Sequence, residues 1–282
     1  MSVRVYGKIN LALNVEGSDG RGYHRLDTVM ASVSCFDDVT VTKRTDGAVV
    51  CAFDGRLAPR SNAAAAGRLI AALAGGATGM TIEIKAGIPA GCGLGGSSAD
   101  AAGVLTAGAA LYGLAPGQAE LPKLARRIGS DVPYMLQGGW ARLTGTGETL
   151  RFFEGPRPTE PVLLAYKGKV STAACFAAFD ARGENGSVSD IGLLVETLRA
   201  GIWPPPYPFN NALTAAAADL QPSVGVGLAL MAGLDAAWMT GSGAGLIGLS
   251  GGDARRAAAE KLKAAGFEVR ELFLKNIGLC FI

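Results

Sequence analysis

The feature that most constrains this chain is a glycine-dense stretch at residues 87–102, GIPAGCGLGGSSADAA. It follows the alternating run MTIEIK at 80–85, which predicts a strand, and precedes an alanine-rich segment at 98–112, which predicts a helix. Because glycine lacks a Cβ, Gly91, Gly93, Gly95 and Gly96 let backbone N–H groups approach a ligand closely. The helix adds the unpaired N–H groups of its first turn, where Ser97 and Ser98 are candidate capping residues. The stretch therefore predicts a polyphosphate site, with a flexible strand–helix connector as the alternative.

The pattern excludes several common phosphate sites. No lysine follows the glycines, so the Walker A pattern is absent. Gly91, Gly93 and Gly96 satisfy G-x-G-x-x-G, but a dinucleotide-binding unit needs a second strand ending in an acidic residue, and Glu120 lies in a helical stretch with no apolar strand before it. Protein kinases use a similar loop, yet H-R-D and D-F-G do not occur in the chain.

Composition excludes further classes of function. The 282 residues carry 26 Lys+Arg and 24 Asp+Glu, so the net charge of +2 offers no strong field for nucleic acid. The single histidine, His24, excludes a His-rich metal site. The five cysteines form no C-x-x-C pair, which favours free thiols in a reducing cytoplasm. The N-terminus lacks a signal-peptide h-region, and the longest uncharged stretch is too rich in Ala and Gly for a membrane span, so we expect no membrane partner.

Hydrophobic patterning predicts an α+β protein. Strands are expected at 3–15, 28–44, 80–85, 162–166, 245–249 and 267–273, and helices at 62–73, 98–112, 120–128, 172–180, 189–200, 209–219 and 253–265. Ser61 is the candidate N-cap of the first of these helices. The segment EGPRPTEP at 154–161 is polar and proline-rich, which is typical of a domain boundary. We therefore expect two domains, residues 1–154 and 155–282.

The stretch PAGCGLGGSSA at 89–99 resembles the P-x-x-x-G-L-G-S-S-A signature of the GHMP kinases. Three further segments are similar to motifs of the same family and fall in the expected order: KINLAL at 8–13 with Gly22-Tyr23-His24, GSDVP at 129–133, and MTGSG at 239–243. Together they resemble the member whose acceptor is a cytidine diphosphate-linked sugar alcohol. Kinases of homoserine or mevalonate are the nearest rivals, but their substrates carry no cytosine for a Gly-Tyr-His element to recognise.

The resemblance implies a two-domain GHMP kinase fold. The N-terminal, ATP-binding domain would be like the second domain of ribosomal protein S5, the C-terminal domain would be ferredoxin-like, and the active site would lie in the cleft between them. It implies a small-molecule kinase that uses ATP and Mg²⁺, with Mg²⁺ bridging the β- and γ-phosphates. The partners would be small molecules only, and the oligomeric state and the metal ligands are left open. A catalytically dead nucleotide-binding module is the rival from another class.

The resemblance assigns catalysis to Lys8 and Asp131. Transfer to a hydroxyl needs charge neutralisation and a group that accepts the hydroxyl proton. Asp131 suits the role of proton acceptor. Lys8 suits charge neutralisation and would also keep Asp131 ionised. Taken from the residues alone, a solvated strand lysine and a turn or N-cap aspartate remain the alternatives.

The remaining candidate residues divide between the two substrates. The resemblance assigns ATP binding to the loop and to the first residue of the helix expected at 62–73: Pro89, Ala90, Gly91, Cys92, Gly93, Leu94, Gly95, Gly96, Ser97, Ser98, Ala99 and Asn62. It assigns the acceptor to Asn10, Tyr23, His24, Thr172 and Phe176, with His24 and Tyr23 around a cytosine ring. Gly241, Ser242 and Gly243 would support the phosphate loop from the second domain or form only a tight turn. Asp100 is a candidate Mg²⁺ ligand or a partner of the helix dipole.

Overall fold

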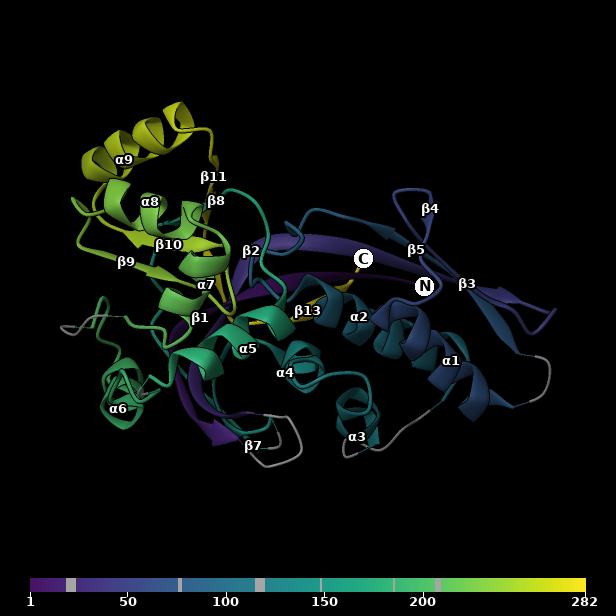
Figure 1. The fold of residues 1–282 in the computed structure, drawn as a ribbon. Helices are drawn as coiled ribbons and strands as arrows, with labels where there is room; N and C mark the ends of the chain where they lie inside the picture. Colours follow the sequence, from purple (N-terminus) through teal and green to yellow (C-terminus); the bar gives the residue numbers. More distant parts are fainter. Residues whose placement is uncertain (19–23, 76–77, 115–119, 148, 185, 206–208) are drawn as a thin grey trace.

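The computed structural model describes residues 1–18, 24–75, 78–114, 120–147, 149–184, 186–205 and 209–282. Runs of strands and runs of helices follow one another along the chain, and the strands form two separate sheets (Figure 1). Two buried apolar clusters hold the fold together, and each includes residues from both sheets. The α+β class predicted from the sequence is confirmed.

Two long antiparallel strands form the centre of the larger sheet. These are β1 (Ser2–Ser18) and β2 (His24–Arg44), whose register pairs Val3 with Val39 and Lys8 with Ser32. The sheet has nine strands, and the main order is β13-β1-β2-β5-β3-β4. Its other members are β3 (Val49–Phe53), β4 (Arg56–Leu57), β5 (Gly79–Lys85), β6 (Trp140–Gly145), β7 (Thr149–Phe153), β12 (Leu274–Lys275) and β13 (Leu279–Phe281).

Helices cover one face of this sheet (Figure 1): α1 (Asn62–Ala74), α2 (Gly96–Leu111), α3 (Glu120–Arg126) and α4 (Val132–Gln137). Ser61 caps α1 as the sequence predicts, because its hydroxyl accepts the amide N–H of Ala64 at 3.1 Å. Small residues let α2 lie close to the strands, since a Cβ on Gly103 would stand 2.7 Å from Val5. The alanine-rich helix is therefore a buried element that fixes where the glycine-rich loop ends.

The smaller sheet has the order β11-β8-β10-β9. Its strands are β8 (Val162–Tyr166), β9 (Ala236–Met239), β10 (Leu246–Leu249) and β11 (Glu268–Leu272), all antiparallel to their neighbours. The helices of this half are α5 (Thr172–Arg182), α6 (Ile191–Arg199), α7 (Thr214–Leu220), α8 (Ser223–Leu230) and α9 (Gly252–Ala264). The turn between β9 and β10, residues 240–245, points back toward the larger sheet and reaches the glycine-rich loop.

The last strand of the chain, β13, lies beside the first strand, β1. After β11 the chain returns to the larger sheet, where β13 pairs with β1 and the amide of Ile282 donates to the carbonyl of Ser2 at 3.1 Å. The proline-rich segment 154–161 lies between β7 and β8, and the division at 154/155 stays a prediction. Within the described ranges, no helix combines the length and apolar character needed to cross a membrane.

Candidate active site

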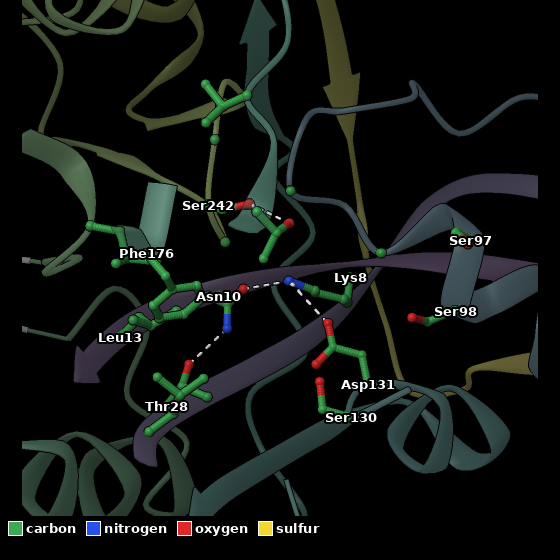
Figure 2. A pocket seen from close by; sticks show the side chains of 18 of the residues that line it. Lys8, Asn10, Leu13, Thr28, Ser97, Ser98, Ser130, Asp131, Phe176 and Ser242 are labelled. Carbon is green, nitrogen blue, oxygen red and sulfur yellow. Dashed lines mark hydrogen bonds and ion pairs between the residues drawn. The ribbon is translucent and has the colours of Figure 1, made fainter. Parts of the chain in front are cut away.

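The glycine-rich loop is shaped by three glycines in the left-handed region. Gly91, Gly93 and Gly95 have φ values of 73°, 71° and 74°, which other residues adopt only at a cost. Gly95 is also the N-cap of α2, and no side chain caps that helix. The prediction that Ser97 and Ser98 cap it was therefore wrong, because both lie inside the first turn. Their side chains instead line a cavity beside the loop (Figure 2).

The turn at residues 240–245 packs directly on this loop. A Cβ on Gly93 would stand 2.1 Å from the carbonyl oxygen of Thr240, and one on Gly245 would stand 2.2 Å from the carbonyl oxygen of Cys92. The amide of Ala244 donates to the carbonyl of Gly91 at 3.2 Å. Gly241, Ser242 and Gly243 thus lie in a tight turn that contacts the glycine-rich loop, and their support of bound phosphates stays a prediction.

Lys8 lies on β1 at the floor of the cavity, with only 4% of its surface exposed. Its Nζ donates to Oδ1 of Asn10 at 2.6 Å and stands 3.8 Å from Oδ2 of Asp131 (Figure 2). Burial lowers the pKa of Lys8, and the nearby Asp131 carboxylate opposes that shift. Lys8 is therefore a buried cation aimed into the cavity, not a solvated strand lysine.

Asp131 occupies the N-cap position of α4, where Pro133 starts the helix. Its side chain makes no capping hydrogen bond, and a third of it is exposed to the cavity. The carboxylate faces Lys8 instead of the helix (Figure 2). A reactive role is thus open to it that a capping aspartate would not have.

Asn10 holds Lys8 in place. Its Oδ1 accepts from Lys8, and its Nδ2 donates to Oγ1 of Thr28 at 2.8 Å. Thr28 in turn donates its hydroxyl hydrogen to the carbonyl of Ala12 at 2.6 Å, so its oxygen accepts from Asn10. The side chain of Asn10 is therefore engaged within the protein, and a direct hydrogen bond from it to the acceptor stays a prediction.

The cavity around these groups has a volume of about 310 Å³. Of the predicted residues it brings together Lys8, Asn10, Gly91, Gly93, Gly95, Gly96, Ser97, Ser98, Asp131, Thr172, Phe176, Gly241, Ser242 and Gly243. The lining residues that the sequence did not single out are Leu13, Leu26, Thr28, Ser130, Leu143, Val170 and Leu213. Most of these are ordinary apolar residues, so no local signal distinguishes them from core.

Other predicted ATP residues do not line this cavity. Cys92, Leu94 and Ala99 are buried, and all three belong to the larger apolar cluster. Pro89 and Ala90 lie in the loop outside the lining residues, and Asn62 is the first residue of α1. Their assignment to ATP stays a prediction.

His24 does not line the cavity but contacts Phe176, which does. Its ring stacks on Phe176, with centroids 4.5 Å apart and planes inclined by 21°. Its Nε2 shares a hydrogen bond of 2.7 Å with Oδ1 of Asp180, a residue that the sequence did not single out although it lies one helical turn after Phe176 on α5. The hydroxyls of Thr172 and Ser242 share a hydrogen bond of 3.0 Å. Tyr23 lies outside the described residues.

The described residues contain no group of three or more His, Cys, Asp or Glu side chains that could enclose a metal ion. Asp131 is the one carboxylate among the described residues that line the cavity. Asp100 is not there: only 2% of its surface is exposed, and its carboxyl lies beneath the loop against Asp37. Such a site fits Mg²⁺ that is bound mainly by substrate phosphates and water, as is usual for this ion.

A glycine-rich loop before a buried helix, a second-half turn seated on it, and a lysine–aspartate pair at the cavity floor define the class of the GHMP kinases. The family "GHMP kinases N terminal domain" matches residues 61–139, which contain the loop and Asp131. The crystal structure of the Methanococcus jannaschii mevalonate kinase aligns with a TM-score of 0.68 over 98% of both chains, but at 15% identity it shows the fold alone.

Two closer relatives narrow the class. The 4-diphosphocytidyl-2-C-methyl-D-erythritol kinase of Thermus thermophilus is 36% identical over 264 residues, which is 92% of this chain and 91% of the relative. A crystal structure of 4-(cytidine 5'-diphospho)-2C-methyl-D-erythritol kinase aligns with a TM-score of 0.74 at 34% identity, covering 97% of this chain and 99% of the other. The chain belongs to the 4-diphosphocytidyl-2-C-methyl-D-erythritol kinase family.

Proposed function

We propose that this protein transfers the γ-phosphoryl group of ATP to the 2-hydroxyl of 4-diphosphocytidyl-2-C-methyl-D-erythritol, which yields the 2-phosphate and ADP. This is the kinase step of the non-mevalonate route to isoprenoid precursors. The observation that carries the proposal is the Lys8–Asp131 pair at the floor of a cavity that is lined by the glycine-rich loop and by Phe176, on which His24 stacks.

Asp131 would accept the proton of the acceptor hydroxyl. In the same step the hydroxyl oxygen would form a bond to the γ-phosphorus, and the bond from that phosphorus to the bridging oxygen of ADP would break. Lys8 would stabilise the negative charge that develops on the transferred group. Asn10 keeps the Lys8 ammonium between the loop and Asp131, because it fixes the ammonium with a 2.6 Å hydrogen bond. In-line positioning would come from the rigid elements β1 and α4 that carry the two catalytic residues.

The loop would hold the ATP phosphates through backbone N–H groups that the left-handed glycines expose, together with the first turn of α2. When bound to the β- and γ-phosphates, Mg²⁺ would neutralise part of their charge. Among described residues, Asp131 is the carboxylate near enough to the cavity to meet that ion, directly or through water.

The acceptor would enter from the α5 side. Phe176 offers an apolar face, and the imidazole of His24 offers a nitrogen that can hydrogen-bond a cytosine edge. Thr172 and Ser242 place two hydroxyls at the junction of the halves, within reach of a diphosphate.

The five cysteines are all free thiols, which supports the expectation of a reducing, cytoplasmic environment.

An ADP-release assay with a panel of acceptors tests this function. We expect turnover with 4-diphosphocytidyl-2-C-methyl-D-erythritol and at most a trace with mevalonate or homoserine. A preference for mevalonate or homoserine would overturn the acceptor but keep the kinase. No turnover with any acceptor, together with intact ATP binding, would support a nucleotide-binding module instead.

A further inference from the structure

A buried carboxylate holds the start of the phosphate loop. Asp37 lies on β2 with 3% of its surface exposed. Its Oδ1 accepts two backbone N–H groups, from Gly87 at 2.6 Å and from Ile88 at 2.7 Å. Those are the residues at which the chain leaves β5 and enters the loop, so Asp37 fixes the direction in which the loop begins.

A second buried carboxyl holds the other end. Asp100 lies in α2, the helix that follows the loop, and 2% of its surface is exposed. Its carboxyl faces the carboxyl of Asp37, and Oδ2 of Asp37 lies 3.9 Å from where a Cβ on Gly96, one helical turn before Asp100, would stand. Oδ1 of Asp100 has no hydrogen-bond partner among the described residues. A carboxylate is an acceptor only, so a hydrogen bond between the two carboxyls requires a proton on one of them. Two charged carboxylates at hydrogen-bonding distance and out of water would be strongly unfavourable.

The surroundings place that proton on Asp100. Burial and the charge of Asp37 raise the pKa of Asp100 well above its ordinary value. The pKa of Asp37 is also raised by burial, but the two loop N–H groups stabilise its charged form. The titratable or charged groups acting around the pair come from β2, β3, the β3–β4 turn and β11, and they are Cys35, Cys51, Asp54 and Arg270.

Cys35, Cys51 and Asp54 supply no counter-charge to the pair, and the cation Arg270 is hydrogen-bonded to the loop backbone. Burial raises the pKa of both thiols, so Cys35 and Cys51 remain neutral at physiological pH. Asp54 adds a further negative charge beside Asp37. Arg270 donates from Nη1 to the carbonyl of Gly87 at 2.9 Å, which supports the same end of the loop through its backbone. The proton is therefore what keeps the two carboxyls together.

We propose that Asp37 and Asp100 share one proton and so clamp the two ends of the phosphate loop, which makes Asp100 a positioning residue for ATP. The proposal rests on the proposed function only in that the loop receives ATP phosphates. Loss of the proton would place two like charges beneath the loop, weaken the clamp and lower the affinity for ATP. The acceptor site, more distant from the pair, would be affected much less.

The test compares the pH dependence of the KM for ATP in the wild type, Asp100→Asn and Asp100→Ala. An asparagine can donate the same hydrogen bond to Asp37 without a proton to lose. We expect Asp100→Asn to keep its KM for ATP within about threefold of wild type at neutral pH and to hold it constant as the pH rises. The wild-type KM should rise on the alkaline side. Asp100→Ala should raise it by about tenfold at every pH, because Asp37 then lacks its donor.

Asp253→Asn is the matched control, because Asp253 lies in the first turn of α9 with an exposed side chain away from the cavity. It should change neither KM nor its pH dependence. If the KM of Asp100→Asn rises with pH as in the wild type, the clamp is wrong. A fall in kcat with unchanged KM for ATP would also overturn it. If the proposed acceptor is wrong, ATP binding titrated without acceptor compares the pH dependence of ATP affinity among the same variants. If Asp100→Ala fails to fold, the comparison of Asp100→Asn with wild type tests the clamp by itself.

Discussion

The ammonium group of Lys8 stands 3.8 Å from the carboxylate of Asp131, while its short hydrogen bond of 2.6 Å goes to Asn10. Lys8 thus places a positive charge beside Asp131 without occupying its oxygens as a tight hydrogen-bond donor. One carboxylate oxygen remains open toward the cavity (Figure 2). Asn10 fixes the position of the ammonium, and Asp131 only faces it. The same lysine can therefore face both the ATP phosphates and the acceptor hydroxyl.

The first prediction concerns Asp131→Asn, which keeps the shape of the side chain but cannot take a proton. We expect kcat to fall by about 10²–10⁴-fold, the usual contribution of a general base. The KM for ATP should change by less than about threefold, because the loop that binds the phosphates is untouched. Steady-state kinetics with both substrates measure this. Ser130→Ala, a neighbour lining the same cavity, is the control and should keep most activity. Near-normal kcat in Asp131→Asn would remove its role as the base.

The second prediction concerns the pH dependence of stability at Lys8. Burial lowers the pKa of Lys8, so folding disfavours its charged form, and the cost is present at neutral pH. As the pH rises through the lowered pKa, Lys8 loses its proton and the cost disappears. Lys8→Met should therefore be inactive yet about 1 kcal/mol more stable than wild type at neutral pH, and this gain should shrink as the pH rises.

Urea unfolding at neutral and alkaline pH checks the difference between Lys8→Met and wild type. Lys123→Met, on the exposed side of α3, is the matched control and should show no pH-dependent gain. A gain in Lys8→Met that stays constant or grows as the pH rises would contradict the effect of burial on Lys8.

Sequence and structure agree where a short local pattern determines the geometry. The strand at 80–85, the helix capped by Ser61 and the glycine-rich loop between strand and helix are local features, and all three are found. The prediction that Ser97 and Ser98 cap α2 failed for a local reason too. Gly95 adopts a left-handed conformation, so the helix begins one residue after it and includes both serines.

Contacts between distant strands could not be predicted in the same way. Asp37 precedes the period-2 run of β2 and reads as a solvated carboxylate, until β2 pairs with β5 and places it under Gly87. Asp180 reads as an exposed residue of α5, and only the stacking of Phe176 from that helix on His24 brings the two residues together. The helix α4 is six residues long, too short for a periodic signal, yet it presents Asp131.

The third prediction concerns recognition of the acceptor. His24→Ala should raise the KM for the cytidine-bearing acceptor by about tenfold or more, with little effect on the KM for ATP. Asp180→Asn should raise the acceptor KM by only about three- to tenfold, because it weakens one hydrogen bond that orients His24. Asp219→Asn removes an exposed ion pair with Arg182 instead and should be neutral. Equal effects of His24→Ala on both substrates would place His24 outside the acceptor site.

The fourth prediction separates backbone strain from contact at the junction of the two halves. An alanine at Gly93 would adopt φ near 71° and would also place its Cβ 2.1 Å from the carbonyl oxygen of Thr240. An alanine at Gly113 would adopt φ near 64° with nothing within 4 Å, so it would have backbone strain without a steric clash.

Gly113→Ala should lose about 1–2 kcal/mol of unfolding free energy and keep its kinetics. Gly93→Ala should lose at least about 1 kcal/mol more and raise the KM for ATP by about tenfold or more, because the turn at 240–245 is pushed off the loop. Urea unfolding and steady-state kinetics on both variants measure this, and equal KM values for ATP would mean that the loop does not depend on that contact.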